Sequence, residues 1–220
     1  MPANTVRSWS LNMSRRPAQQ QAAEVVNVLM AGVGGQGIIT ASAVLAEAAL
    51  AAGYDVKKSE VHGMSQRGGS VESHVRFSTG PVRSPLIPWG GADVVIGLEL
   101  LEALRSAHWC RPGGKILVDD RRIYPATVAA GALEYPQDCL QRLQKHDADT
   151  ILVAAFAIAE ELGEPRAANT VMLGAVSQLL PIPLQAYRQA MEKSIKAKAL
   201  EINLKAFERG REQVTGIAAP

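Results

Sequence analysis

Residues 32–37 are the part of this sequence whose composition and spacing best suit a chemical task. Gly32, Gly34 and Gly37 satisfy the pattern G-x-G-x-x-G, with Gly35 and Gln36 among them. An apolar run precedes the motif and an alanine-rich segment follows it, so it lies between an expected strand and an expected helix. Glycines there let backbone N–H groups approach a phosphate at the helix start. We expect one site for a phosphate-bearing group; the alternative is a tight turn that binds nothing.

A second segment, residues 60–70, concentrates polar residue types on what we predict to be a loop after a strand. Such a density of donors suits a ligand site or a subunit contact. Arg67 could hold a phosphate or carboxylate through two parallel hydrogen bonds. His62 could transfer a proton, but no activated nucleophile is near it in sequence, so we assign no catalytic residue. The candidate binding residues of this segment are Glu60, His62, Gly63, Ser65, Gln66, Arg67, Gly68, Gly69 and Ser70.

Two common nucleotide-binding patterns fit poorly. In a P-loop, lysine and serine or threonine would stand where this sequence has Ile38 and Ile39, which argues against a nucleoside triphosphatase of that type. A nicotinamide dehydrogenase needs an acid at the end of the second strand to bind the ribose. Asp55 lies at the beginning of that expected strand, which leaves Glu60 as the candidate.

Two weaker signals each have two interpretations. Asp119 and Asp120 follow an apolar strand, where they could contact a ribose or a metal ion. Carboxylates that cap the next element are the more common outcome, and we favour it. Trp89 lies in a segment rich in proline and glycine, and it is either an anchor for a partner protein or a residue that packs within its loop.

Composition indicates one α/β domain. The chain has 220 residues, 47% of them apolar, which is enough for a core without disulfide bonds. Cys110 and Cys139 are isolated, so we expect two small buried side chains in a reducing compartment rather than a disulfide or a metal cage. The longest apolar run, residues 151–159, is too short to span a bilayer. No secretory signal is apparent, and we expect a soluble cytoplasmic protein without a membrane partner.

Charge is unevenly distributed. Residues 1–23 contain three arginines and no acid, and we expect a flexible or partner-binding tail there. Removing these three from the 23 basic residues leaves 20 against 21 acidic residues. Because the remainder is nearly neutral and lacks a basic stripe, a nucleic-acid partner is not indicated.

The elements that must position these residues alternate between strands and helices. We predict a doubly wound, Rossmann-like, mostly parallel sheet with one antiparallel strand and a helical C-terminal annex, in a single domain over residues 24–216. The alternating pattern of residues 71–77 indicates the half-exposed antiparallel strand. The expected strands are 25–30, 54–59, 71–77, 94–96 and 116–118, with a turn at 111–114 and an apolar segment at 151–162. The expected helices are 38–52, 98–107, 137–144, 170–180, 184–193 and 197–211.

Taken together, these motifs resemble the gamma-type domain of 2-oxoacid:ferredoxin oxidoreductases, and within that family the small subunit of the indolepyruvate type. The similarity covers about residues 24–212 and rests most on the glycine motif paired with the His-Gly-Met-x-Gln-Arg-Gly-Gly-Ser sequence of residues 62–70. It continues through residues 73–77, 92–97, 112–114, 123–125, 173–175 and 206–207, with Glu99, Asn169, Asn203 and Gly210. Asp119 and Asp120 depart from the Asn-Thr-like residues expected in relatives.

The resemblance implies an accessory subunit that is not catalytic alone. Complexes of this family decarboxylate a 2-oxoacid on thiamine diphosphate, pass electrons through [4Fe–4S] clusters to ferredoxin and release an acyl-CoA. This chain lacks a Gly-Asp-Gly motif for thiamine diphosphate and Mg²⁺, and two separated cysteines cannot hold a four-cysteine cluster. We therefore expect those cofactors on a large partner subunit. This chain would help to close the active site. Residues 32–37 and Arg67 would either contact the pyrophosphate of CoA or only pack against the partner, and the resemblance leaves both open.

Two other function classes stay open at this stage. One is a stand-alone nicotinamide-dependent Rossmann dehydrogenase, and the other is a non-enzymatic nucleotide-binding module. The identity of the 2-oxoacid and of the electron acceptor also stays open, because both are expected to bind mainly to the partner.

Overall fold

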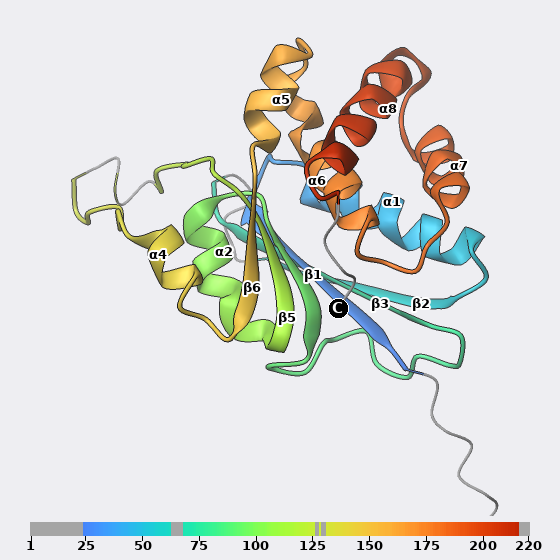
Figure 1. Ribbon diagram of the computed structural model, residues 1–220, viewed down its shortest axis with the longest axis horizontal. Coiled ribbons are helices and arrows are strands. Elements are labelled where there is room, and N and C mark those ends of the chain that lie inside the picture. The colour runs from blue at the N-terminus through green and yellow to red at the C-terminus, as the bar shows by residue number, and fades with distance from the viewer. Residues whose placement is uncertain (1–23, 63–67, 126–127, 129–130, 216–220) are drawn as a thin grey trace, which may run out of the picture.

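The computed structural model describes residues 24–62, 68–125, 128 and 131–215. A six-stranded sheet with the order β2-β3-β1-β4-β5-β6 forms its centre (Figure 1). The strands are β1 (Val26–Val33), β2 (Asp55–His62), β3 (Ser70–Ser78), β4 (Ala92–Gly97), β5 (Cys110–Asp119) and β6 (Ala148–Val153). β1, β4, β5 and β6 pair in parallel, whereas β3 is antiparallel to both β1 and β2. The prediction of a mostly parallel sheet with one antiparallel strand is confirmed.

Helices cover both faces of the sheet because side chains alternate along each strand. Val28 and Met30 of β1 belong to the core beneath α1, α5, α6, α7 and α8, whereas Leu29 belongs to the core beneath α2, η1 and α4. This arrangement confirms a doubly wound α/β fold. The helices are α1 (Ile38–Ala51), α2 (Leu100–Ser106), the 3₁₀ helix η1 (Ala107–Trp109), α4 (Cys139–Leu143), α5 (Ala155–Glu161), the 3₁₀ helix η2 (Pro165–Ala167), α6 (Ala168–Ser177), α7 (Leu184–Ser194) and α8 (Ala197–Glu212).

The C-terminal helices α6, α7 and α8 lie on the same face as α1 (Figure 1). α6 and α8 approach closely where Gly174 faces the carbonyl of Phe207 and Gly210 faces the carbonyl of Val171. A side chain at either glycine would overlap that backbone, so the crossing depends on both glycines. Among the described residues, no helix has the length and apolar character needed to cross a membrane.

Three local predictions differ from the structure in their boundaries. β2 extends to His62 rather than ending at residue 59, because it pairs with β3 along its whole length. The apolar segment 151–162 divides into the end of β6 and α5. The turn predicted at 111–114 lies inside β5, where Gly113 has a φ of 70° and the pairing with β4 shifts its register.

β3 is less exposed than its alternating sequence predicts. The alternation over residues 71–77 places His74 on the polar side of that strand, but its side chain is only 1% exposed. The backbone N–H of Ile87 donates to His74 Nδ1 at 3.3 Å, and the Trp109 ring lies 5.2 Å from the imidazole. The connection between β3 and β4 therefore covers a strand face that the local pattern assigned to water.

Cys110 and Cys139 are both buried and free, which confirms their expected role as small core side chains. The helix at 38–52 is also confirmed, and Gly53, with a φ of 89°, follows α1 in the left-handed conformation expected for a helix end.

Candidate functional site

The glycine motif forms the turn between β1 and α1. Gly35 and Gly37 adopt φ values of 106° and 79°, a region that side-chain-bearing residues rarely occupy. At Gly32 the need is space, because a Cβ atom there would lie 2.7 Å from Gln36 Oε1 and 3.1 Å from Leu98 Cβ. Gly32, Gly35 and Gly37 are therefore required by the path of the backbone, as the sequence predicts for a turn that approaches a ligand closely.

Gln36 uses its side chain to hold the turn together. Its Oε1 accepts from the backbone N–H of Val33 at 2.7 Å, and its Nε2 donates to the carbonyl of Leu98 at 2.6 Å. Leu98 in turn donates its N–H to Ala31 at 2.9 Å, which ties the end of β4 to the end of β1. The role that this geometry supports for Gln36 is to position the loop, while direct ligand contact stays a prediction.

The two motifs singled out in the sequence meet at Gly34. Its N–H donates to the carbonyl of Gly69 at 2.8 Å, and Gly68 donates to the carbonyl of Gly34 at 3.5 Å. Ser70 begins β3 directly opposite Val33 of β1. The end of the second motif therefore lies against the glycine turn, although residues 38–59 separate the two segments in the chain.

The start of α1 is well suited to an anion. Gly37 occupies the N-cap position without a side chain to satisfy the first N–H groups, and the first turn contains no acidic residue. These N–H groups and the helix dipole give the helix start a partial positive charge. α1 is 14 residues long, so the full dipole is developed there.

A cavity of about 410 Å³ opens at this helix start. Its volume falls within the range of small-molecule sites, which is roughly 300–1,000 Å³. His62 enters it from β2, so the cavity joins a residue of the second motif to the glycine turn. The lining residues are Val33, Gly34, Gly35, Gly37, Ile38, Ile39, His62 and Val71.

Glu60 does not lie where a dinucleotide site requires an acid. It sits on β2, which β3 separates from β1, whereas a dinucleotide-binding fold places the second strand beside the first. Its carboxylate forms an ion pair with Lys58 Nζ at 2.6 Å. The remaining predicted site residues, Gly63, Ser65, Gln66 and Arg67, lie outside the described residues, and their role stays a prediction.

Asn169 is a site residue to which sequence reasoning gave no role. This α6 side chain is 7% exposed, and its Nδ2 donates to the carbonyl of Gly37 at 3.0 Å. The adjacent Thr170 donates through Oγ1 to Asn203 Oδ1 of α8 at 2.6 Å. The polar side chains of Asn169, Thr170 and Asn203 therefore connect the glycine turn to the two C-terminal helices α6 and α8. The separation of 132 residues left no local signal for this contact, and only the family resemblance singled Asn169 out.

Asp119 caps a helix, although not the element that follows it directly. Its Oδ1 accepts from the N–H of Phe156 at the start of α5, at 3.3 Å, whereas Oδ2 has no partner within the described part of the chain. Burial raises the pKa of this carboxyl to about 7. Asp120 is exposed, and the described residues contain no group of three or more histidine, cysteine or acidic side chains arranged to hold a metal ion.

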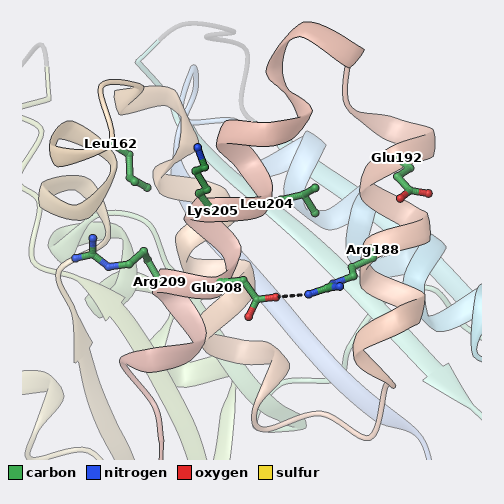
Figure 2. Close-up of a pocket in the computed structure, with 7 residues that line it drawn as sticks. All are labelled: Leu162, Arg188, Glu192, Leu204, Lys205, Glu208 and Arg209. Atoms are coloured by element: carbon green, nitrogen blue, oxygen red, sulfur yellow. Dashed lines mark hydrogen bonds and ion pairs between the residues drawn. The ribbon is translucent and has the colours of Figure 1, made fainter.

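A larger cavity, of about 540 Å³, lies between α5, α7 and α8 (Figure 2). Its rim is charged, but the charges compensate one another: Arg188 pairs with Glu208 at 3.0 Å and Arg209 with Glu161 at 3.1 Å. It shares no lining residue with the cavity at the glycine turn. Because the turn combines a helix start with both sequence motifs, we take the smaller cavity as the functional site.

Known proteins resemble this chain over most of its length. Residues 27–213 match the pyruvate ferredoxin/flavodoxin oxidoreductase family. The chain is 42% identical over 192 residues to indolepyruvate oxidoreductase subunit IorB of Archaeoglobus fulgidus, across 86% of this chain and 94% of that protein. It is 39% identical over 189 residues to the subunit of the same name from Pyrococcus horikoshii, across 84% and 93%.

Two solved structures share the fold. The gamma subunit of a keto/oxoacid ferredoxin oxidoreductase from Geobacter sulfurreducens aligns with a TM-score of 0.66 at 24% identity, over 87% of this chain and 99% of that chain. A 2-oxoglutarate:ferredoxin oxidoreductase from Magnetococcus marinus aligns with a TM-score of 0.70 at 22% identity. The alignment covers 89% of this chain and 32% of that one, so here the fold forms part of a longer polypeptide.

Proposed function

This chain belongs to the pyruvate ferredoxin/flavodoxin oxidoreductase family, and from that membership we propose that it is the small accessory subunit of an indolepyruvate-type 2-oxoacid:ferredoxin oxidoreductase. The complex would oxidatively decarboxylate an arylpyruvate to an acyl-CoA and pass the electrons to ferredoxin. Support comes from the matching length of the indolepyruvate oxidoreductase subunits, 94% of the Archaeoglobus fulgidus protein being covered. The stand-alone dehydrogenase is set aside, because Glu60 is held by Lys58 away from β1.

The reactive cofactors belong, in this proposal, to a large partner subunit that carries thiamine diphosphate, Mg²⁺ and [4Fe–4S] clusters. Two cysteines in the whole sequence are too few for a cluster with four thiolate ligands. Cofactors perform the chemistry in such enzymes, while the protein supplies binding and orientation. Cys110 and Cys139, free and buried, suit the reducing conditions of the cytoplasm, where we place the complex.

This chain's own contribution is to receive the pyrophosphate of CoA at the start of α1. The residues fit such a group, because Gly37 leaves the first N–H groups of the helix without a side-chain cap. His62 of β2 also lines this cavity. CoA would supply the thiol that accepts the acyl group. The hydrogen bond between Gly34 and Gly69 is the observation that carries this proposal, since it joins both motifs at one cavity.

Purification of the native complex tests the proposal. We expect the chain to co-purify with a larger subunit that contains thiamine and iron, and we expect turnover with indolepyruvate or phenylpyruvate to exceed turnover with branched 2-oxoacids. The isolated chain should be inactive and should not bind NADH. Oxidation of a 2-oxoacid by the purified chain alone would contradict the assignment of the reactive cofactors to the partner subunit.

A further inference from the structure

Asn169 is a buried polar side chain that reaches the candidate site without lining it. It lies in the first turn of α6, is 7% exposed, and is not among the residues that line the cavity at the glycine turn. α6 lies beside the start of α1 (Figure 1), and Asn169 Nδ2 donates to the carbonyl of Gly37 at 3.0 Å. Any effect of Asn169 on a ligand in the cavity therefore passes through the peptide group of Gly37.

The carbonyl of Gly37 and the N–H of Ile38 belong to one peptide group. Because a trans peptide group is planar, its C=O and N–H bonds point in opposite directions, and fixing one fixes the other. The N–H of Ile38 is the first of the N–H groups at the start of α1 that have no partner inside the helix, and Gly37 has no side chain to cap them. Both residues line the cavity. The hydrogen bond from Asn169 therefore sets the direction of an N–H group that a phosphate at the helix start would meet.

The same hydrogen bond strengthens that N–H group as a donor. The carbonyl of Gly37 accepts twice, from Asn169 Nδ2 and from the N–H of Ala41 at 3.0 Å. A helix alone supplies only the second of these bonds. Hydrogen bonds in series polarise one another, so a peptide group whose carbonyl accepts two bonds has a more positive N–H group. Asn169 therefore adds to the attraction between the N–H of Ile38 and an anion.

Two neighbouring polar side chains hold the amide of Asn169 in its donating orientation. Thr170 Oγ1 lies 3.2 Å from Asn169 Oδ1 and 2.6 Å from Asn203 Oδ1 of α8. Asn203 is itself oriented, because its Nδ2 donates to the carbonyl of Ala199 at 2.8 Å. With its oxygen toward the Thr170 hydroxyl, Asn169 presents its NH₂ group to Gly37. Every residue of α6 is buried, so the donor is attached to a helix that the core holds on all sides.

We propose that Asn169 is a positioning residue for the pyrophosphate of CoA: through the carbonyl of Gly37 it directs and polarises the N–H of Ile38 toward the phosphate. The inference rests on the proposed function, because that function supplies the ligand. It extends the CoA site to a helix that does not line the cavity. A purely structural role would make Asn169 one of several contacts between α6 and the core, and its loss would then not distinguish CoA from the 2-oxoacid.

The experiment compares steady-state kinetics of the intact complex for the wild type, N169A, N169D and Q178A. N169A should raise the KM for CoA about threefold to tenfold, the range expected for one lost hydrogen bond, and should leave the KM for the 2-oxoacid unchanged. N169D should raise the KM for CoA further, because a carboxylate would repel both the Gly37 carbonyl oxygen and the phosphate. Gln178, at the other end of α6, is the matched control: its Nε2 donates to the carbonyl of Arg211 of α8 at 3.4 Å, and Q178A should leave the KM for CoA unchanged.

A second variant gives the answer if N169A does not fold or assemble. T170V removes the hydroxyl that orients the Asn169 amide, and it should raise the KM for CoA by a smaller factor in the same direction. An unchanged KM for CoA in the variant that assembles would overturn the inference, as would an equal rise in KM for CoA and for the 2-oxoacid. Ile39→Glu, at the cavity itself, separates the two levels of the argument. If this variant also leaves the KM for CoA unchanged, the proposed CoA site is refuted rather than the role of Asn169 within it.

Discussion

Asn169 Nδ2 lies 3.0 Å from the carbonyl oxygen of Gly37, although 132 residues separate the two in the chain. The same carbonyl accepts the N–H of Ala41 at 3.0 Å, the first hydrogen bond of α1. Asn169 of α6 therefore holds the carbonyl group at the start of α1 in place. This contact couples the packing of the C-terminal helices to the geometry of the candidate anion site.

Gly37→Ala should destabilise the fold more than Gly35→Ala. Both residues have positive φ, but a Cβ at Gly37 would overlap Asn169 Nδ2, whereas a Cβ at Gly35 has no neighbour within 4 Å. We expect G37A to lower the free energy of unfolding by about 2–4 kcal/mol, and G35A by about 1 kcal/mol from backbone strain alone. Urea unfolding followed by circular dichroism measures both. Equal losses for the two variants would mean that the Asn169 contact does not restrict Gly37.

Ile39→Glu should weaken the binding of CoA without weakening that of the 2-oxoacid. Ile39 lines the cavity and is 51% exposed, so a carboxylate there would oppose a phosphate at the helix start. We expect the KM for CoA in the assembled complex to rise about tenfold, which corresponds to about 1.4 kcal/mol. Leu50→Glu, on the same helix and equally exposed at 51%, is the control. If the two variants behave alike, the α1 start is not where CoA binds.

Asp119→Asn should stabilise the chain at alkaline pH. Burial is the largest cause that raises the pKa of this carboxyl from 3.8 to about 7. Between pH 3.8 and about 7, the folded state retains a proton on this carboxyl that the unfolded state has lost. The free energy of unfolding therefore decreases as the pH rises from about 4 to 7. Asparagine keeps an acceptor for the N–H of Phe156 but carries no charge. The variant should gain about 1–3 kcal/mol at pH 8.

Urea titrations at pH 5 and pH 8 provide the measurement for Asp119→Asn. The gain over the wild type should be small at pH 5 and larger at pH 8. A gain that does not change with pH would show that the stabilisation comes from packing and not from the carboxyl's ionisation.

His74→Gln should remove part of the acid sensitivity of the fold. Burial lowers the pKa of His74 below its ordinary value of 6.5; Glu72 opposes this shift, and Arg76 adds a smaller lowering. Below pH 6.5 the unfolded state therefore binds a proton that the folded state rejects, and stability falls as the pH decreases. Glutamine can still accept from Ile87 but does not titrate. The loss of stability between pH 7.5 and 5.5 should therefore be smaller in H74Q than in the wild type.

Thermal melts across this pH range distinguish the outcomes for His74. Parallel melting curves for the wild type and H74Q would show that His74 does not contribute to the acid sensitivity.

Local features of the sequence were sufficient for most of the helices and strands and for the glycine turn. The spacing of Gly32, Gly34 and Gly37 predicts the turn because glycine alone adopts φ values such as 79° without strain. The alternation over residues 71–77 predicts the antiparallel strand, since side chains of a strand point to opposite faces. These inferences succeed because each depends on residues only a few positions apart.

Only the tertiary structure decided how those parts meet. β3 lies between β2 and β1, and this strand order separates Glu60 from the glycine turn. The connection between β3 and β4 covers His74. Asp119, at the end of β5, caps α5, which follows β6 in the chain. The contact between Asn169 and Gly37 and the hydrogen bond between Gly34 and Gly69 depend in the same way on distant segments. The physical reason is that propensity and periodicity act over one or two turns of chain, whereas strand order and helix crossing depend on which apolar surfaces are buried together.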